Sequence, residues 1–422
     1  MNKKEILSIL NLSTYVALDF ETTGLDPKQD RIIEFAAIRF VNGKPKKRYS
    51  TLINPGVHIS PFITRITGIS NQMVSTAPDE EDIIDDLFSI IGKYPLVAHN
   101  IRFDWNYLLE LCKRYNKDIP ENPLYDTLQL ARTMLFDHPV FNLGALSEFY
   151  GLDSSGSHRA EKDTENCGNI FLYLLDELSE YTLEEISRVI SVIEKYDIPN
   201  KKLYVDLANA LLKKGDLKGS LNIRSKKRKS RQNIYQYEGP ENIQNITAAE
   251  VFGSGGILSK NYDWYEDRIN QVEYANMCDK IINSTGSGVL EAGTGLGKSM
   301  GYLFAAMKRK YETKERGPVV IGCNTKHLQD QLFFKDLPQL TDALKTSVTA
   351  LIIKGRKNYI CRTRFNWVVS ESNILSDQDI EAIIPILFWL EWTESGDISE
   401  CSGFLNTRKT WIWSMICSDM GY

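Results

Sequence analysis

The stretch that decides the fold of the first domain is Val16-Ala-Leu-Asp-Phe-Glu-Thr-Thr-Gly24. Its apolar run begins at Tyr15 and is typical of a strand that is buried on both faces. Asp19 and Glu21 interrupt this run, and a side-chain period of two places both carboxylates on one face at the strand end. The turn Thr22-Thr-Gly-Leu25 follows, where glycine lets the backbone approach another molecule closely. An isolated buried carboxylate is costly, so this pair requires a cation, a proton or many hydrogen bonds.

Two further segments place an acidic residue on an apolar helical face. In His99-Asn-Ile-Arg-Phe-Asp104 we expect a helix that is capped by Asn100, with Asp104 on the same stripe as the apolar residues around it. In His158-Arg-Ala-Glu-Lys-Asp163 the acid at the end of the segment lies among apolar residues of a second helix. Three separate segments therefore break the apolar pattern in the same way.

Each of these residues alone has a simpler interpretation. A single acid at a strand end or in a first helical turn is usually a helix cap or a solvated residue. His158, taken alone, fits a surface histidine in a loop rich in Ser and Gly. Taken together, four carboxylates and one imidazole suit two hard divalent cations and a general base, which is the chemistry of phosphodiester hydrolysis.

The three segments resemble the Exo I, Exo II and Exo III motifs of the DnaQ-like (DEDDh) 3′–5′ exonucleases, over roughly residues 10–180. The resemblance implies an α/β, RNase H-like fold, in which helices flank a central mixed sheet. It also implies that two Mg²⁺ or Mn²⁺ ions are held by Asp19, Glu21, Asp104 and Asp163. His158 would be the general base that takes a proton from the attacking water. Asp126 is either a residue that supports this site or an ordinary helix cap.

Composition sets the outer limits of the interpretation. A length of 422 residues predicts two or three domains, and 42% hydrophobic with 25% charged residues is ordinary for a protein with ample core. A net charge of −5 gives no global nucleic-acid signature, so any DNA contact must be local. Seven cysteines without regular pairing favour a reducing compartment. With no signal peptide and no apolar run of membrane-spanning length, we expect a cytoplasmic protein without membrane contact.

Beyond residue 180 the sequence changes character. Helical patterns continue through residues 183–195 and 203–214, and residues 222–231 then carry six basic residues and no acid. This basic run could contact phosphates, although a solvated linker is the favoured interpretation. Residues 232–260 are polar and rich in Asn and Gly, so they are predicted to continue the linker.

A second motif lies further along the chain. Gly288-Val-Leu-Glu291 is predicted to be a strand, followed by the P-loop Ala292-Gly-Thr-Gly-Leu-Gly-Lys-Ser299 and a helix, with Ala292 in place of the usual first glycine. The loop would hold ATP phosphates through Gly293, Thr294, Gly295 and Gly297, with Lys298 on the β- and γ-phosphates and Ser299 on Mg²⁺.

The neighbouring segments resemble helicase motifs. The segment from Tyr265 to Gln271 resembles a helicase Q motif, in which Arg268 and Gln271 would read adenine. Residues 323–332 resemble motif Ia, and residues 354–361 fit the same family. Together they resemble the start of a DinG-type superfamily 2 helicase with a partial P-loop, RecA-like domain.

The chain departs from that helicase family in two ways. Only 123 residues follow Ser299, and they contain neither a Walker B acidic pair nor a second motor domain. Many relatives hold a 4Fe–4S cluster whose first ligand is in the position of Cys361, but Cys401 and Cys417 lack the spacing of the other three, so no cluster is assigned. We therefore interpret the chain as a truncated product or a fragment, which would bind ATP but hydrolyse it poorly.

The sequence thus predicts an exonuclease domain over residues 1–180, a helical and basic linker over 181–260, and a partial helicase domain over 261–422. The expected activity is metal-dependent release of nucleoside 5′-monophosphates from DNA that is single-stranded or presents a 3′ end. Two alternatives stay open: a nucleotide-gated binding module with an idle nuclease site, and a polymerase-proofreading exonuclease. The choice between DNA and RNA also stays open, and no protein partner is indicated.

Overall fold

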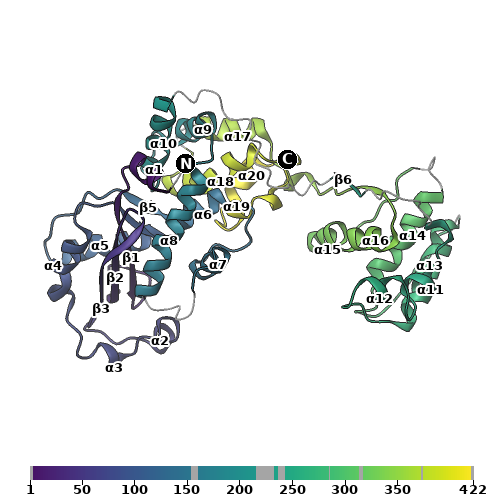
Figure 1. Ribbon diagram of the computed structural model, residues 1–422, viewed down its shortest axis with the longest axis horizontal. Coiled ribbons are helices and arrows are strands. Elements are labelled where there is room, and N and C mark those ends of the chain that lie inside the picture. Colours follow the sequence, from purple (N-terminus) through teal and green to yellow (C-terminus); the bar gives the residue numbers. More distant parts are fainter. Residues whose placement is uncertain are drawn as a thin grey trace. The chain divides into compact units, whose positions relative to one another are not determined.

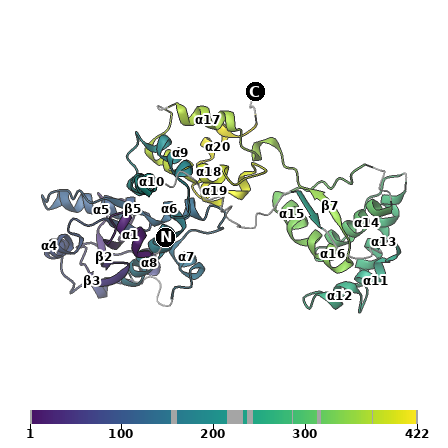
Figure 2. The same cartoon turned by 45° about the horizontal axis from the view of Figure 1, so that its top comes forward.

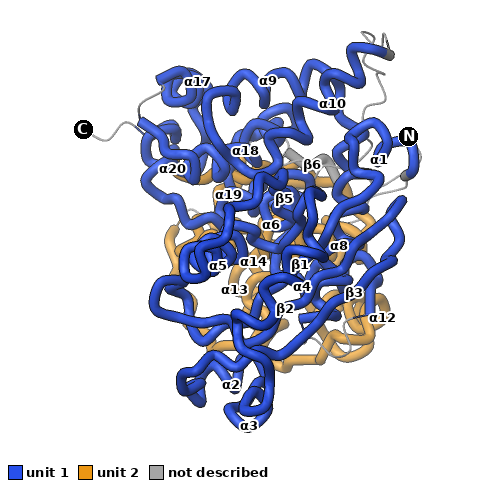
Figure 3. The backbone as a smooth tube through the Cα atoms, turned by 90° about the vertical axis from the view of Figure 1, so that its left-hand side faces the viewer, with its two compact units in different colours: residues 1–225, 356–422 blue, residues 226–355 orange. Residues whose placement is uncertain are grey.

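The computed structural model describes residues 3–153, 160–214, 232–235, 243–284, 286–312, 317–371 and 374–419. The chain divides into two compact units, coloured in Figure 3. The first unit contains Met1–Ser225 and Arg356–Tyr422, and the second contains Lys226–Gly355. The first unit is therefore built from chain on both sides of the second.

A five-stranded sheet organises the first unit. Its strands, in chain order, are β1 (Thr14–Thr22), β2 (Ile32–Val41), β3 (Lys44–Leu52), β4 (Leu96–Ala98) and β5 (Leu124–Asp126). The spatial order is β3-β2-β1-β4-β5, with antiparallel pairs on the β3 side of β1 and parallel pairs on the β5 side. The predicted mixed sheet is confirmed.

Helices cover both faces of this sheet (Figure 1). Up to residue 214 they are α1 (Lys3–Ile9), α2 (Pro61–Thr67), α3 (Asn71–Val74), α4 (Glu80–Ile91), α5 (Ile101–Arg114), α6 (Thr127–Met134), α7 (Leu143–Phe149), α8 (Ala160–Leu178), α9 (Leu183–Ile193) and α10 (Lys201–Lys214). Alternate residues of β1 point to opposite faces, so Val16 and Leu18 pack in the core with α4 and α5, whereas Tyr15 and Ala17 pack in the core with α8. No described helix is both long and apolar enough to cross a lipid bilayer.

The C-terminal part of the chain completes this same unit. It contains η3 (Arg356–Asn358), α17 (Arg362–Ser370), α18 (Asp377–Leu390), η4 (Ile398–Glu400), α19 (Ser402–Leu405) and α20 (Thr410–Ile416). Helix α18 packs against α6 and α9, as Figure 2 shows. The sequence predicts a helicase domain over 261–422 that includes this segment. The structure differs because the apolar side chains of α18 enter the core that α8 and α9 also line.

The second unit has its own core. Its elements are β6 (Gln232–Tyr235), η1 (Ile243–Asn245), α11 (Ala248–Phe252), α12 (Ile257–Asn261), α13 (Ile269–Asn283), α14 (Lys298–Glu312), α15 (Lys326–Gln331), the π-helix η2 (Leu332–Asp336), α16 (Leu337–Leu344) and β7 (Val348–Leu351), with β6 and β7 antiparallel. The linker is predicted to extend to residue 260, but in the structure regular helices begin before that residue. Val251, Phe252 and Leu258 are buried in this core, so residues 243–261 are part of a folded unit.

The predicted strand before the P-loop is wrong in this structure. Residues 287–293 have no regular secondary structure, and Val289 is 97% exposed. A strand needs a neighbour that completes its backbone hydrogen bonds, and no described strand pairs with this segment. The sequence supplies an apolar run here, but neither β6 nor β7 pairs with it.

Candidate nuclease site and nucleotide-binding loop

Asp19 and Glu21 lie near the C-terminal end of β1, on the face of the sheet that α8 covers. Glu21 is the direct partner of Glu34 in the antiparallel register of β1 and β2. Desolvation raises the pKa of Glu21 to about 7, with repulsion from Glu34 and Asp163 adding to it. The pKa of Asp19 is also raised well above its ordinary value, by desolvation and then by the charges of Asp104, Glu21, Asp163 and Glu34. The β1 end is therefore a crowded group of carboxylates.

Asp104 reaches this group from the first turn of α5. It is 3% exposed, and its Oδ1 accepts the backbone N–H of Phe20 at 3.0 Å, directly between the two acids of β1. Desolvation raises its pKa well above the ordinary value, although the Phe20 N–H opposes this. The predicted inward orientation of Asp104 is confirmed. The predicted side-chain cap at Asn100 is not, because this residue has a left-handed backbone (φ 77°) and its side chain makes no cap hydrogen bond.

Asp126 holds the entry to α5 in place of that cap. Its Oδ1 accepts the Asn100 N–H at 3.2 Å and also caps α6, through the amides of Leu128 and Gln129. The backbone of Asp126 is held in turn by Asn200, whose Oδ1 accepts the Asp126 N–H at 2.9 Å. Desolvation raises the pKa of Asp126 to about 6. Asp126 is therefore a helix cap, and it also anchors the start of the helix that carries Asp104.

Asp163 comes from the first turn of α8. This helix carries the expected apolar face, since Ala160, Cys167, Phe171 and Leu174 are all buried. The charge of Asp163 raises the pKa of both Asp19 and Glu21, so this acid faces the β1 pair. The structure therefore brings together the four predicted acids from β1, α5 and α8. His158 lies outside the described residues.

The donor set of this cluster suits hard divalent cations. The pKa of Asp19 is raised only by desolvation and by neighbouring carboxylates, and such a group is stabilised by protons or by positive charge. Carboxylate oxygens are the ligands that Mg²⁺ and Mn²⁺ prefer. Within the described residues, no three Asp, Glu, His or Cys side chains are gathered closely enough to form a ready metal-binding set. The four acids are neighbours, and cation binding would require their side chains to close on the ion.

Two features of this site were missed in the sequence. Glu34 is buried beside Glu21, and the signal that could have found it is the same as for Asp19, an acid within the apolar run Ile32-Ile-Glu-Phe-Ala-Ala37. The second is the anchoring of the Thr22–Leu25 turn, where the carbonyl of Gly24 accepts the hydroxyl of Tyr107 at 2.9 Å. A Cβ atom at Gly24 would lie 2.3 Å from the carboxylate of Asp30, so a larger residue there would have to displace the Asp30 side chain.

The predicted P-loop curves tightly before α14. Gly295 and Gly297 both have φ of 81°, a backbone conformation that glycine adopts without strain. Gly293 has open space around its Cα, and Thr294 lies exposed in the turn of the loop. Lys298, the first residue of α14, donates to the carbonyls of Ala292 at 2.7 Å and Gly293 at 2.9 Å. The lysine side chain thus folds over the loop whose amides were expected to hold phosphates.

The Q-motif residues lie against the same loop. Gln271 is 1% exposed, donates to the Gly297 carbonyl at 3.1 Å and accepts the hydroxyl of Tyr265 at 2.8 Å. Arg268 also approaches Gly297. Ser299 bonds the carboxylate of Asp336. The sequence therefore located residues that do converge, but in this structure Gln271 contacts loop backbone.

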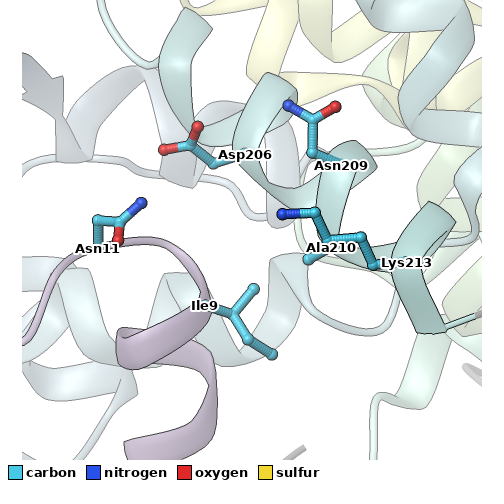
Figure 4. Close-up of a pocket in the computed structure, with 6 residues that line it drawn as sticks. All are labelled: Ile9, Asn11, Asp206, Asn209, Ala210 and Lys213. Atoms are coloured by element: carbon cyan, nitrogen blue, oxygen red, sulfur yellow. The ribbon is translucent and has the colours of Figure 1, made fainter.

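A separate pocket of about 360 Å³ lies in the first unit between the end of α1 and one face of α10 (Figure 4). It is lined by Ile9, Asn11, Asp206, Asn209, Ala210 and Lys213. None of the predicted site residues lines it.

The comparison with known families bears on the carboxylate cluster. Residues 16–171 match the family model described as "Exonuclease". The matched segment begins in β1 and ends in α8, so it contains all four acids. The N-terminal part of the chain is an exonuclease-family domain.

The matches to curated relatives extend beyond this exonuclease-family domain. The chain is 29% identical over 418 residues to the "3'-5' exonuclease DinG" of Bacillus subtilis (strain 168), a match that covers 97% of this chain and 44% of the relative. It is 26% identical over 398 residues to the protein of the same name from Staphylococcus aureus (strain MRSA252), covering 93% and 42%. The chain thus spans less than half the length of the curated relatives it matches.

Solved structures are also similar to part of the chain. "Exonuclease X in complex with 5' overhanging duplex DNA" is 27% identical, with a TM-score of 0.33, over 40% of this chain and 95% of that chain. Exonuclease I of E. coli in complex with a dT13 oligonucleotide is 22% identical, with a TM-score of 0.39, over 44% and 47%.

Proposed function

We propose that the protein is a metal-dependent 3′–5′ exonuclease that hydrolyses DNA from its 3′ end and releases nucleoside 5′-monophosphates. The observation that carries this proposal is the meeting of Asp19, Glu21, Asp104 and Asp163, which come from three distant segments, at one end of β1. Relatives that are named 3′–5′ exonucleases match nearly the whole chain, which supports degradation in the 3′ to 5′ direction.

The four acids would hold two Mg²⁺ or Mn²⁺ ions, which when bound supply Lewis-acid stabilisation of the charge on the reacting phosphate. His158 would take a proton from the attacking water. The water oxygen forms a bond to phosphorus as the bond from phosphorus to the O3′ of the preceding nucleotide breaks. The terminal nucleotide leaves with its 5′-phosphate, and the shortened strand keeps a 3′-hydroxyl.

The Thr22–Leu25 turn after β1 is held in place by hydrogen bonds and would contact the 3′ end of the substrate. Thr22 Oγ1 donates to the Gly24 carbonyl at 2.6 Å, and Tyr107 donates to the same oxygen. The turn therefore keeps its shape beside the acids, and Leu25 is 85% exposed at its tip. Its position suits contact with the terminal nucleotides, because exposed apolar side chains can pack against bases.

Replacement of Asp19 tests the proposal. We expect Asp19→Asn, which preserves the shape of the side chain but removes its charge, to reduce degradation of single-stranded DNA in Mg²⁺ by at least about 100-fold. The assay uses 5′-labelled DNA and matched RNA, with chromatography to identify the released nucleotide. Asp85→Asn, which changes an exposed acid paired with Lys117, is the control and should leave the rate unchanged.

Two results would contradict the proposal. One is degradation that persists in Asp19→Asn, which would place the chemistry elsewhere. The other is wild-type protein that binds DNA in Mg²⁺ without shortening it, which would favour the alternative of a binding module with an idle nuclease site. Faster degradation of RNA than of DNA would correct the substrate class.

We also propose that the loop of residues 292–299 binds ATP. The two left-handed glycines, the helix that begins at Lys298 and the contact of Gln271 with Gly297 support this assignment. Backbone amides at a helix N-terminus favour an anionic ligand, and Lys298 would exchange its bonds to loop carbonyls for phosphate oxygens.

Replacement of Lys298 separates this binding from the nuclease reaction. We expect Lys298→Ala to weaken the binding of a fluorescent ATP analogue by at least about 10-fold, since an ion-pair partner of the phosphates is lost. DNA degradation should stay unchanged in this variant. Lys280→Ala, at the far end of α13, is the matched control for loss of a lysine in the same unit. Loss of degradation in Lys298→Ala would instead favour a nucleotide-gated nuclease.

A further inference from the structure

The first observation concerns the register between β1 and β2. Glu21 and Glu34 are direct partners in an antiparallel pair, so their side chains point to the same face of the sheet. Like charges directly opposite one another destabilise a sheet. Glu34 is nevertheless buried at 5% exposure, in a run of strand that is otherwise apolar. A buried carboxylate whose charge acts on both Glu21 and Asp19 requires an explanation beyond core packing.

The second observation links Glu34 to the helix of the third motif. Glu34 Oε2 accepts the backbone N–H of Ala160 at 3.4 Å, and Ala160 is the first residue of α8. The first N–H groups of a helix have no partner within the helix, so an acid from a strand is a favourable acceptor for one of them. Asp163 lies on the same first turn, three residues further along α8.

The rest of α8 is held to the sheet further along the helix. The Tyr15 hydroxyl donates to the carbonyl of Gly168 at 2.9 Å, and a Cβ at Gly168 would lie 2.3 Å from the ring of Phe40. These contacts fix the middle of the helix close to β1 and β2. The Glu34 contact holds the beginning of the helix, where Asp163 lies, together with an exposed ion pair between Arg48 of β3 and Glu161.

From these contacts we infer that Glu34 is a positioning residue of the nuclease site: it ties the first turn of α8 to β2 and so sets the distance between Asp163 and the β1 pair. This inference rests on the proposed nuclease function. Glu34 acts through its hydrogen bond as an acceptor, and its negative charge is tolerated in that role. The position of Asp163 relative to Asp19 and Glu21 is in this way set by a residue outside the three sequence motifs.

The experiment compares Glu34→Ala with Glu34→Gln. An amide oxygen can still accept the Ala160 N–H, whereas alanine cannot. We expect Glu34→Ala to lower kcat for single-stranded DNA by about 10–100-fold with KM unchanged, since small misplacement of a reacting group has effects of this size. For Glu34→Gln, we expect kcat to stay within about three-fold of the wild-type value.

Glu80 offers a matched control in the same unit. It is also a buried glutamate that accepts a backbone N–H of β2, from Ile32 at 3.2 Å, but it comes from α4 and contacts none of the four acids in the described residues. Glu80→Ala should lower the melting temperature at least as much as Glu34→Ala and leave kcat unchanged. A merely structural role for Glu34 would make the two alanine variants behave alike.

Three outcomes would overturn the inference. In the first, Glu34→Ala keeps the wild-type kcat. In the second, Glu34→Gln is as slow as Glu34→Ala and needs more Mn²⁺ for half-maximal rate, which would make Glu34 a metal ligand. In the third, the two alanine variants lose kcat equally. Wild type and Asp19→Asn are measured alongside, because failure of the nuclease proposal itself would show as inactivity of the wild type.

Discussion

At the scale of single residues, His99 shows how a motif residue can serve the fold. Its Nε2 lies 2.9 Å from the carbonyl of Phe141, and its Nδ1 lies 3.0 Å from the hydroxyl of Thr127. A carbonyl can only accept, so Nε2 carries a proton. The Thr127 hydroxyl also donates to the carbonyl of Ala98 at 3.2 Å, so the contact at Nδ1 does not by itself set the charge of the ring. The burial of the ring favours its neutral form. Desolvation lowers the pKa of His99 to about 4, although the Phe141 carbonyl opposes this.

This lowered pKa predicts a dependence of stability on pH. An unfolded histidine has a pKa of about 6.5, so between pH 6.5 and 4 the unfolded chain binds a proton that the folded chain does not. The contribution of His99 is complete above pH 6.5 and is lost as the pH falls towards 4, by at most about 3 kcal/mol. We expect His99→Gln, which keeps a donor for Phe141, to show a smaller loss of unfolding free energy between pH 7.5 and 5 in urea titrations. The exposed His58, replaced by Gln, serves as control, and equal pH slopes in all three proteins would refute the assignment.

At the scale of elements, the sequence predicted best where burial alone decides the outcome. The apolar run of β1 and the inward faces of α5 and α8 follow from periodicity, and with them the direction of Asp19, Asp104 and Asp163. The cap at Asn100 could not be predicted, because its left-handed backbone depends on Asp126, which comes 26 residues later in the chain. The Asn200 contact with Asp126 is equally invisible, since nothing in the local sequence indicates a partner 74 residues away.

An apolar run also gives a wrong strand prediction when no neighbouring strand pairs with it. Residues 288–291 read as a buried strand, yet in the structure they are coil. Residues 318–321 are another apolar run without regular secondary structure, and Val320 is 84% exposed. Periodicity reports what a segment could bury, and a strand forms only where a neighbour accepts its hydrogen bonds. By contrast, residues 243–261 looked polar enough for a linker, and a few apolar side chains were sufficient to fold them into short helices.

At the scale of the whole molecule, the exonuclease-family domain is completed by a part of the chain that follows the proposed nucleotide-binding loop. Phe388 of α18 packs edge-on against Tyr181 with ring centroids 4.5 Å apart, and Trp389 is 1% exposed. Arg102 Nε donates to Glu381 Oε1 at 2.9 Å, so α18 also contacts the helix that carries Asp104. The boundary at residue 180 fails as a prediction of the folding unit, because composition shifts mark segments of sequence and cannot show which distant segment fills a core.

Gly403 provides a test of this packing that does not depend on activity. Its N–H donates to the Phe136 carbonyl at 2.8 Å, and a Cβ on it would lie 2.0 Å from the Arg132 carbonyl of α6. We expect Gly403→Ala to push α19 off α6 and to lower the unfolding free energy by about 1–3 kcal/mol, the usual cost of overpacking. The measurement is thermal and urea unfolding of the full chain.

The control for this prediction is Gly144→Ala in α7. The added Cβ would meet only the Asn142 side chain, at an ordinary contact distance of 3.7 Å, and alanine in a helix is favourable. This variant should be neutral or slightly stabilising. If residues 356–419 did not pack on the exonuclease-family domain, Gly403 would have no carbonyl to collide with. The two alanine variants would then differ little in stability, and the domain would fold independently of the C-terminal segment.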